Sequence, residues 1–196
     1  MPETRYRAVL LFGAPGVGKG TQGQRLARLP QFIHLSTGDM FRSLDKNSPL
    51  GKEVREFTER GELVPDELTI RIFRDAVQRL AESRQFNAGE DTLVLDGIPR
   101  NVNQCRILDN DIRVVRIIHL VSFDAEAMVA RLKKRAQLEG RKDDADEAVI
   151  RHRLDVYRRQ TAPVLEYYPQ SLVLEIDALG TPDEVAAAIQ RRLLNQ

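Results

Sequence analysis

The sequence predicts an α/β fold, a five-stranded parallel sheet flanked by helices in one domain. Three observations predict it. The chain has 196 residues, which suits one domain with a core large enough to need no disulfide or structural metal. Short apolar runs alternate with amphipathic stretches along the chain. No repeat, low-complexity tract or break in composition interrupts this alternation. Continuous apolar runs of this length are typical of parallel strands buried on both faces.

Each apolar run is expected to be a strand, and the stretches between them are expected to be helices. The expected strands are residues 7–12, 32–35, 92–95, 114–121 and 172–176. The expected helices are residues 20–29, 38–44, 50–60, 65–83, 101–108, 124–138, 145–168 and 182–194. Such helices cover both faces of a parallel sheet, and ligands of these sheets bind beyond the carboxyl ends of the strands.

The composition excludes several classes of function. The formal net charge is +1, from 30 basic and 29 acidic residues, so we expect no nucleic acid and no membrane partner. Cys105 is the single cysteine, which excludes an internal disulfide and a multi-cysteine zinc site. The apolar stretch 8–12 is too short for a membrane span or a secretion signal, so we expect a cytoplasmic location.

A phosphate-binding loop follows the first expected strand. The pattern GxxxxGK runs from Gly13 to Lys19, directly before an expected helix. Glycines let the backbone turn its N–H groups around phosphate oxygens, and the helix adds its positive end. Lys19 is able to reach the β- and γ-phosphates of a nucleotide. The general motif has Ser or Thr directly after the Lys, but here Gly20 stands there and the hydroxyl comes at Thr21.

Three blocks resemble the adenylate kinase family. Residues 13–22 (GAPGVGKGTQ) resemble its phosphate loop, which carries Gly-Thr after the Lys. Residues 35–42 (LSTGDMFR) resemble its monophosphate-binding segment. Residues 95–100 (LDGIPR) resemble its LDGFPR block, with Ile98 in place of the usual Phe. The resemblance runs from about residue 7 to the C-terminus, and implies a P-loop NTPase fold with reversible phosphoryl transfer from Mg-ATP to AMP, giving two ADP. That reaction implies a role in adenine nucleotide homeostasis.

The donor site and the metal follow from these motifs. Asp96 ends an apolar strand, where a carboxylate can hold Mg²⁺ directly or, as we expect, through its waters. No zinc is expected. The resemblance implies that ATP is bound by Gly16, Val17, Gly18, Lys19, Gly20, Thr21, Arg131, Arg135 and Gly180.

The resemblance also implies the acceptor site and its base preference. Thr37 and Gln104 match the residues that recognise adenine, whereas the uridylate/cytidylate branch usually has Ala and Asn there. Buried polar groups that a wrong base would leave unpaired reject that base effectively. The implied AMP-binding residues are Thr37, Arg42, Glu62, Leu63, Val64, Gly97, Ile98, Pro99, Arg100, Gln104, Arg141 and Arg153.

Arginines are expected to stabilise the phosphoryl group in transit. Arg131 and Arg135 lie four residues apart on an expected helix and share one face of it. The transferred group spreads negative charge over its oxygens, so catalysis is mainly positioning and cationic stabilisation. The catalytic residues implied by the resemblance are Lys19, Arg100, Arg131, Arg135, Arg141 and Arg153.

The domain plan has a core and two smaller parts. The core is expected at residues 1–35, 66–135 and 147–196, with a helical acceptor-binding insertion at 36–65. A very short lid is expected at 136–146, because the chain has neither the length nor the cysteines of a zinc-bearing lid domain. We expect a monomer that binds ATP, AMP and ADP.

Three alternatives remain at this point. A UMP/CMP kinase would share the fold, but Thr37 and Gln104 argue against it. A P-loop switch protein that controls a partner would have a hydroxyl residue at position 20 and an NKxD motif, and the chain has neither. An inactive nucleotide-binding module would not need the full set of Lys19, Asp96 and arginines.

Overall fold

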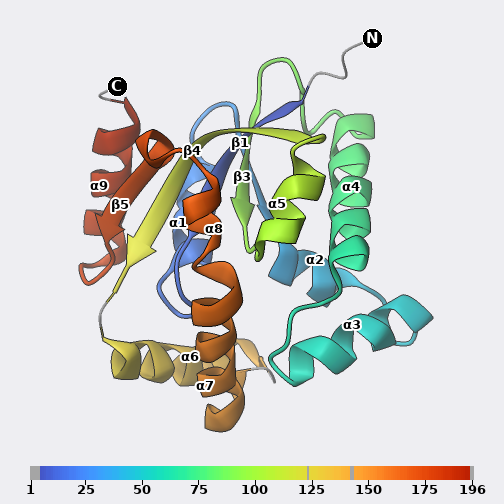
Figure 1. Ribbon diagram of the computed structural model, residues 1–196, viewed down its shortest axis with the longest axis vertical. Coiled ribbons are helices and arrows are strands. Elements are labelled where there is room, and N and C mark those ends of the chain that lie inside the picture. The colour runs from blue at the N-terminus through green and yellow to red at the C-terminus, as the bar shows by residue number, and fades with distance from the viewer. Residues whose placement is uncertain (1–4, 123, 142–143, 195–196) are drawn as a thin grey trace.

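The computed structural model describes residues 5–122, 124–141 and 144–194, and its centre is a five-stranded sheet (Figure 1). The strand order is β2-β3-β1-β4-β5, and every pairing is parallel. The predicted parallel α/β fold is therefore confirmed. The strands are β1 Tyr6–Phe12, β2 Phe32–Ser36, β3 Thr92–Asp96, β4 Ile112–Val121 and β5 Val173–Asp177.

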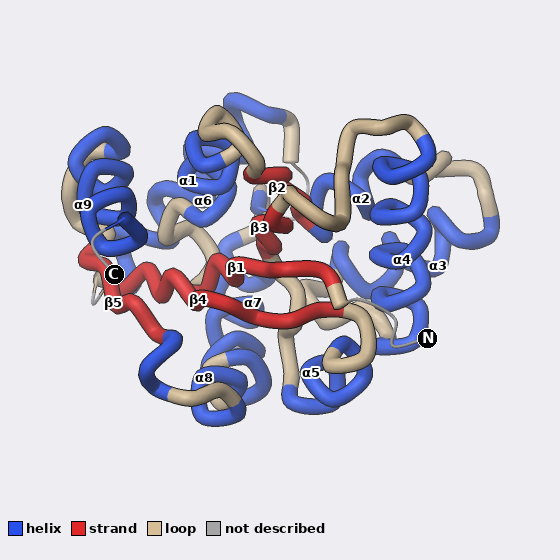
Figure 2. The backbone as a smooth tube through the Cα atoms, turned by 90° about the horizontal axis from the view of Figure 1, so that it is seen from above, coloured by secondary structure: helices blue, strands red, loops and turns tan. Residues whose placement is uncertain are grey.

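The central strand β1 supplies side chains to two cores, one on each face of the sheet. Ala8, Leu10 and Phe12 belong to one core, which is completed by α4 (Asp66–Glu82), α5 (Val102–Leu108) and α8 (Val164–Tyr167). Val9 and Leu11 belong to the other, which is completed mainly by α1 (Lys19–Leu26) and α9 (Pro182–Leu194). Figure 2 shows α1 and α9 on one side of the sheet and α5 and α8 on the other. This alternation explains why β1 is continuously apolar from Ala8 to Phe12.

Two helical pairs lie beyond the carboxyl ends of the strands (Figure 1). The first pair is α2 (Thr37–Ser43) and α3 (Pro49–Glu59), which pack on a small cluster built around Val54 and Val64. The second is α6 (Ala125–Glu139) and α7 (Glu147–Val156), joined by Leu132 and Ile150, both fully buried. Each pair has a hydrophobic cluster distinct from the two cores on the sheet, so each is a structural addition to the sheet.

Side-chain caps place the start of several helices close to the predicted bounds. Ser36 accepts a hydrogen bond from the backbone N–H of Asp39, and Asn101 accepts one from that of Gln104. Asp124 caps α6 in the same way. These residues satisfy N–H groups that the first helical turn leaves free, which is why the chain turns into a helix at these points.

The helix predicted over residues 145–168 is wrong as a single element. It is divided into α7, a π-helical turn at Tyr157–Thr161, and α8. The backbone N–H of Ala162 bonds to the carbonyl of Tyr157 at 2.8 Å, a spacing of five residues. Pro163 follows, has no N–H to donate, and ends the pattern.

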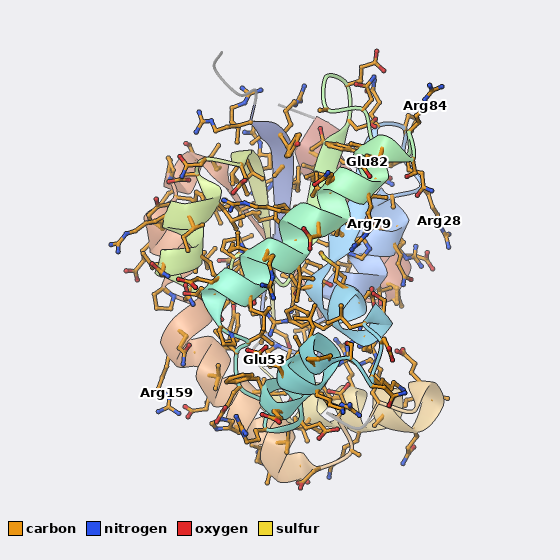
Figure 3. The ribbon with its side chains drawn as sticks, turned by 90° about the vertical axis from the view of Figure 1, so that its right-hand side faces the viewer. Arg28, Glu53, Arg79, Glu82, Arg84 and Arg159 are labelled. Carbon is orange, nitrogen blue, oxygen red and sulfur yellow. The ribbon has the colours of Figure 1, made fainter. Side chains whose placement is uncertain are left out.

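Exposed arginines also occur outside the linings of the two cavities described below. Figure 3 labels Arg28, Arg79 and Arg84, which project outward from the body of the molecule. None of these three lines either of the two cavities described below. Arginine is therefore frequent outside the site as well, so its abundance alone does not indicate a phosphate-binding role. Within the described part of the chain, no helix is long and apolar enough to cross a membrane.

Candidate active site

The phosphate loop occupies the turn between β1 and α1. Gly13 has a φ of +137°, and a Cβ placed there would lie 2.4 Å from the carbonyl oxygen of Leu120. Only glycine fits this close approach to β4. The loop then enters α1 at Lys19, so its N–H groups and the helix N-terminus face one point.

Lys19 is enclosed by its own loop. Its Nζ donates to the carbonyl oxygens of Gly13 at 2.7 Å and Ala14 at 3.1 Å. Burial lowers the pKa of Lys19 to about 8, although the carboxylate of Asp96 acts against this shift, and nearby arginines such as Arg100 lower the pKa further. The ammonium therefore lies in a cationic environment in which an anionic ligand would be favourable.

Asp96 and the following turn bring the end of β3 against the loop. A Cβ on Gly20 would lie 3.6 Å from Oδ2 of Asp96, so this carboxylate faces the start of α1. Gly97 has a φ of +82°, and a Cβ there would lie 2.5 Å from Oγ1 of Thr37. Nε of Arg100 donates to the carbonyl of Gly97 at 2.8 Å. The turn thus holds Thr37 and Arg100 close to Asp96.

A cavity of about 660 Å³ lies over the phosphate loop. Every residue predicted to bind ATP or Mg²⁺ lines it: Gly16, Val17, Gly18, Lys19, Gly20, Thr21, Asp96, Arg131, Arg135 and Gly180. These residues come from the two ends of the chain and from its middle, and the sheet brings them to one edge.

A second cavity of about 390 Å³ adjoins the first, between the α2–α3 pair and the sheet. It is lined by Glu62, Leu63, Val64 and Gln104 among the residues predicted to bind AMP. Four arginines line both cavities: Arg42, Arg100, Arg141 and Arg153. The two spaces therefore meet at a region of concentrated positive charge.

Comparison with known proteins agrees with this geometry. A sequence model described as adenylate kinase matches residues 11–173. Adenylate kinase from Thermus thermophilus is 43% identical over 194 residues, covering 95% of this chain and 97% of that protein. Adenylate kinase from Thermobifida fusca is 44% identical over 184 residues, covering 90% and 93%. Adenylate kinase from Caulobacter vibrioides is 38% identical over 191 residues, covering 94% and 96%.

The chain belongs to the adenylate kinase family. It is therefore an enzyme of the nucleoside monophosphate kinase class. The alternative of a P-loop switch protein is not favoured.

Two residues assigned by the family resemblance do not lie on a cavity wall. Thr37 is buried, and its hydroxyl donates to the carbonyl of Gly97 at 3.0 Å. Ile98 is 2% exposed and packs in the core beneath β1 and β3. Pro99, between Ile98 and Arg100, does line the first cavity. Thr37 and Ile98 shape the wall from behind in this arrangement.

Sequence reasoning missed the carboxylates that hold the arginines. Asp144 is fully buried between Arg135, whose Nε donates to it at 2.7 Å, and Arg153. Arg42 pairs with Asp39 at 2.5 Å. The acidic residues scattered among the arginines were the only signal for these contacts in the sequence, because pairing across elements depends on their packing.

A fourth pair lies at the end of α6. Nε of Arg141 donates to Glu139 at 2.6 Å, and both residues line the two cavities. The predicted lid, residues 136–146, contains this pair together with residues 142–143, which lie outside the described residues. In the described part of the chain, no group of three or more His, Cys, Asp or Glu is placed to hold a metal ion.

Proposed function

We propose that this protein transfers the γ-phosphoryl group of Mg-ATP reversibly to AMP, giving two ADP. The observation that carries the proposal is the pair of adjoining cavities with Arg42, Arg100, Arg141 and Arg153 on both walls. A kinase needs a donor and an acceptor whose phosphates meet, and a switch protein needs one nucleotide. Family membership and the names of the relatives support adenine nucleotides as the substrates.

In this proposal the first cavity holds ATP. The amides of the phosphate loop and Lys19 bind the β- and γ-phosphates, and the ammonium leaves the carbonyls of Gly13 and Ala14 to do so. Gly180, on the wall beyond the loop, lies against the donor base.

The second cavity holds AMP. Arg42 and Arg100 bind its phosphate, and the fork of a guanidinium suits that task. Gln104 reads the adenine edge, and residues 62–64 line the nucleoside. Thr37 acts from behind the wall, where its hydroxyl holds the turn at Gly97.

The transferred group is stabilised by charge that is already in place. Arg131, Arg135, Arg141 and Arg153 line the cavity into which the γ-phosphoryl group points. Mg²⁺ bound to the ATP phosphates would neutralise further charge, and Asp96 would hold it through its waters. The phosphate of AMP is largely ionised near pH 7, since its second pKa is about 6. The acceptor oxygen therefore needs no general base.

The remaining expectations concern the protein in the cell. We propose a monomer that acts in the cytoplasm and has no nucleic acid partner. The formal net charge of +1 supports the last point, because it provides no general attraction to polyanions. Sedimentation at two protein concentrations tests the first.

The experiment mixes purified protein with Mg-ATP and, separately, AMP, CMP, UMP or GMP, and measures the diphosphate formed. The expected result is rapid ADP formation with AMP and at least tenfold less product with each other acceptor. A preference for CMP or UMP would keep the mechanism and overturn the assignment of the base. No transfer to any acceptor would overturn the proposal.

A further inference from the structure

Asp66, the first residue of α4, gathers three side-chain amides around one carboxylate. Its Oδ1 accepts from Nδ2 of Asn101 at 2.8 Å and from Nε2 of Gln104 at 2.9 Å. Its Oδ2 accepts from Nδ2 of Asn103 at 2.8 Å. Asp66 itself lines neither cavity. It therefore lies behind the wall to which Gln104 belongs.

Both ends of the Gln104 amide are held by partners of unambiguous chemistry. Gln104 is 1% exposed, and its Oε1 accepts from the backbone N–H of Arg100 at 2.7 Å. A backbone N–H can only donate, and an ionised carboxylate can only accept. Turning the amide over would place its NH₂ against the N–H of Arg100 and its oxygen against the carboxylate of Asp66, so both hydrogen bonds would be lost and like groups would face each other.

The carboxylate of Asp66 stays ionised across the neutral range. Burial acts to raise its pKa, but the hydrogen bonds from Asn103, Asn101 and Gln104 outweigh burial and hold the pKa below its ordinary value. Asp66 therefore accepts hydrogen bonds and donates none at any pH where the enzyme would work.

The held amide has one bonding pattern left for a ligand. A primary amide has two N–H donors and two oxygen lone pairs, and one of each is used by Asp66 and Arg100. One N–H and one lone pair remain for the second cavity. Adenine offers N1 as acceptor and its 6-amino group as donor, which match this pattern. A 6-oxopurine offers N1–H and O6, which is the reverse.

We propose that Asp66 is a positioning residue that fixes the orientation of the Gln104 amide and so sets the preference for adenine over 6-oxopurine monophosphates. This inference rests on the proposed function, in which Gln104 reads the acceptor base. It adds Asp66, a residue outside the cavity, as the group that determines the orientation of the Gln104 amide.

The test compares AMP with inosine monophosphate, which differs from AMP only at the 6-position and N1. In Asp66→Leu, the Gln104 NH₂ loses its acceptor, so the backbone N–H of Arg100 alone opposes turning of the amide. The ratio of kcat/KM for AMP to that for inosine monophosphate falls by about tenfold, the effect of one hydrogen bond to a charged group. The KM for ATP stays within about twofold, because the donor cavity does not contain Asp66.

Asp66→Asn is the matched variant, because it retains an oxygen at Oδ1 for Asn101 and Gln104. Its amide NH₂ replaces Oδ2, where the exposed Asn103 can turn to present its own oxygen. This variant keeps the selectivity ratio within about threefold of the wild type. Asp66→Ser, which keeps a small polar side chain but does not reach Gln104, is measured beside Asp66→Leu and shows the same fall, so the test does not depend on Leu being tolerated.

Two further variants separate positioning from general structure. In a Gln104→Ala background, Asp66→Leu changes the ratio by less than about twofold, because no amide remains to be oriented. Asn103→Ala also leaves the ratio unchanged.

Equal losses with both acceptors in Asp66→Leu and Asp66→Ser would overturn the inference, since that is what a loosened helix produces. A full effect of Asp66→Leu without Gln104 would overturn it too. A wild-type protein that does not phosphorylate AMP at all would instead overturn the proposed function.

Discussion

Several cations of the site are already paired within the protein. Lys19 bonds to two carbonyl oxygens of its own loop, and Arg42 and Arg141 pair with Asp39 and Glu139. In the proposed function, each of these contacts would be exchanged for phosphate oxygens when a nucleotide binds. The pairing within the protein keeps these side chains ordered before a nucleotide arrives. Less conformational entropy is therefore lost on binding.

The lowered pKa of Lys19 is expected to make ATP binding depend on pH. Burial lowers the pKa to about 8 in the free protein, and phosphates at Nζ favour the charged form and raise it. Below pH 8 the ammonium is charged in both states, and above it binding requires uptake of a proton. The affinity for Mg-ATP is therefore expected to fall as pH rises above 8, by up to about tenfold per unit.

Calorimetry at pH 9 in two buffers of different ionisation enthalpy measures this uptake, because the nucleotide phosphates themselves are fully ionised there. Lys19→Arg is the control, since a guanidinium stays charged at this pH. Proton uptake that persists in Lys19→Arg would assign it to another group.

At the scale of elements, α6 and α7 act as one unit because a buried anion joins them. Arg135 comes from α6, Arg153 from α7, and Asp144 lies between them with no exposed surface. Leu132 and Ile150 pack the same two helices together. Asp144 and Ile150, which line neither cavity, therefore help to fix the geometry of these arginines.

Asp144→Asn is expected to lower kcat by tenfold or more, because one arginine then faces an NH₂ group and turns away. The loss of a buried ionic partner is expected to lower the free energy of unfolding by about 2 kcal/mol. Steady-state kinetics and thermal unfolding measure the two effects.

Glu147→Gln provides the matched comparison. Glu147 also bridges the helices, through Lys133 of α6, and pairs with Arg151 within α7, but it is partly exposed and lines neither cavity. Its removal is expected to leave kcat/KM within about twofold of the wild type. Equal losses of kcat/KM in Asp144→Asn and Glu147→Gln would mean that Asp144 only holds the two helices together and does not position the arginines.

Local patterns determine which parts of the site could be predicted from sequence. The phosphate loop and Asp96 follow strand ends, and parallel strands bring those ends together, so their grouping was predictable. Asp66 and Gln104 are 38 residues apart, and nothing in either segment indicates that α4 and α5 begin side by side. The break at Pro163 was missed because the apolar periodicity continues across it.

At the scale of the whole molecule, the two cavities share four arginines, and both are lined by residues of the α2–α3 pair and of the α6–α7 pair. Substrates on both sides would bring phosphates to the same cations. We expect the two pairs to close over them, because water in this space would compete with AMP for the γ-phosphoryl group.

Without AMP, release of inorganic phosphate from Mg-ATP is therefore expected to be at least about a hundredfold slower than transfer to AMP. A phosphate-release assay beside the transfer assay measures the difference. Adenosine serves as the control, because it would occupy the base site but bring no phosphate to Arg42 and Arg100. Phosphate release from Mg-ATP is expected to stay slow in its presence. Phosphate release at a rate comparable to transfer would show that water is not excluded.

The order of strands also has a consequence for how the chain is synthesised. β1 lies between β3 and β4, and β2 pairs only with β3. The first two strands to leave the ribosome are therefore not neighbours, and neither has a partner until residues 92–96 have followed. About half of the chain is therefore synthesised while β1 has no strand to pair with. The phosphate loop, which follows β1, is expected to reach its folded conformation only after β3 has been synthesised.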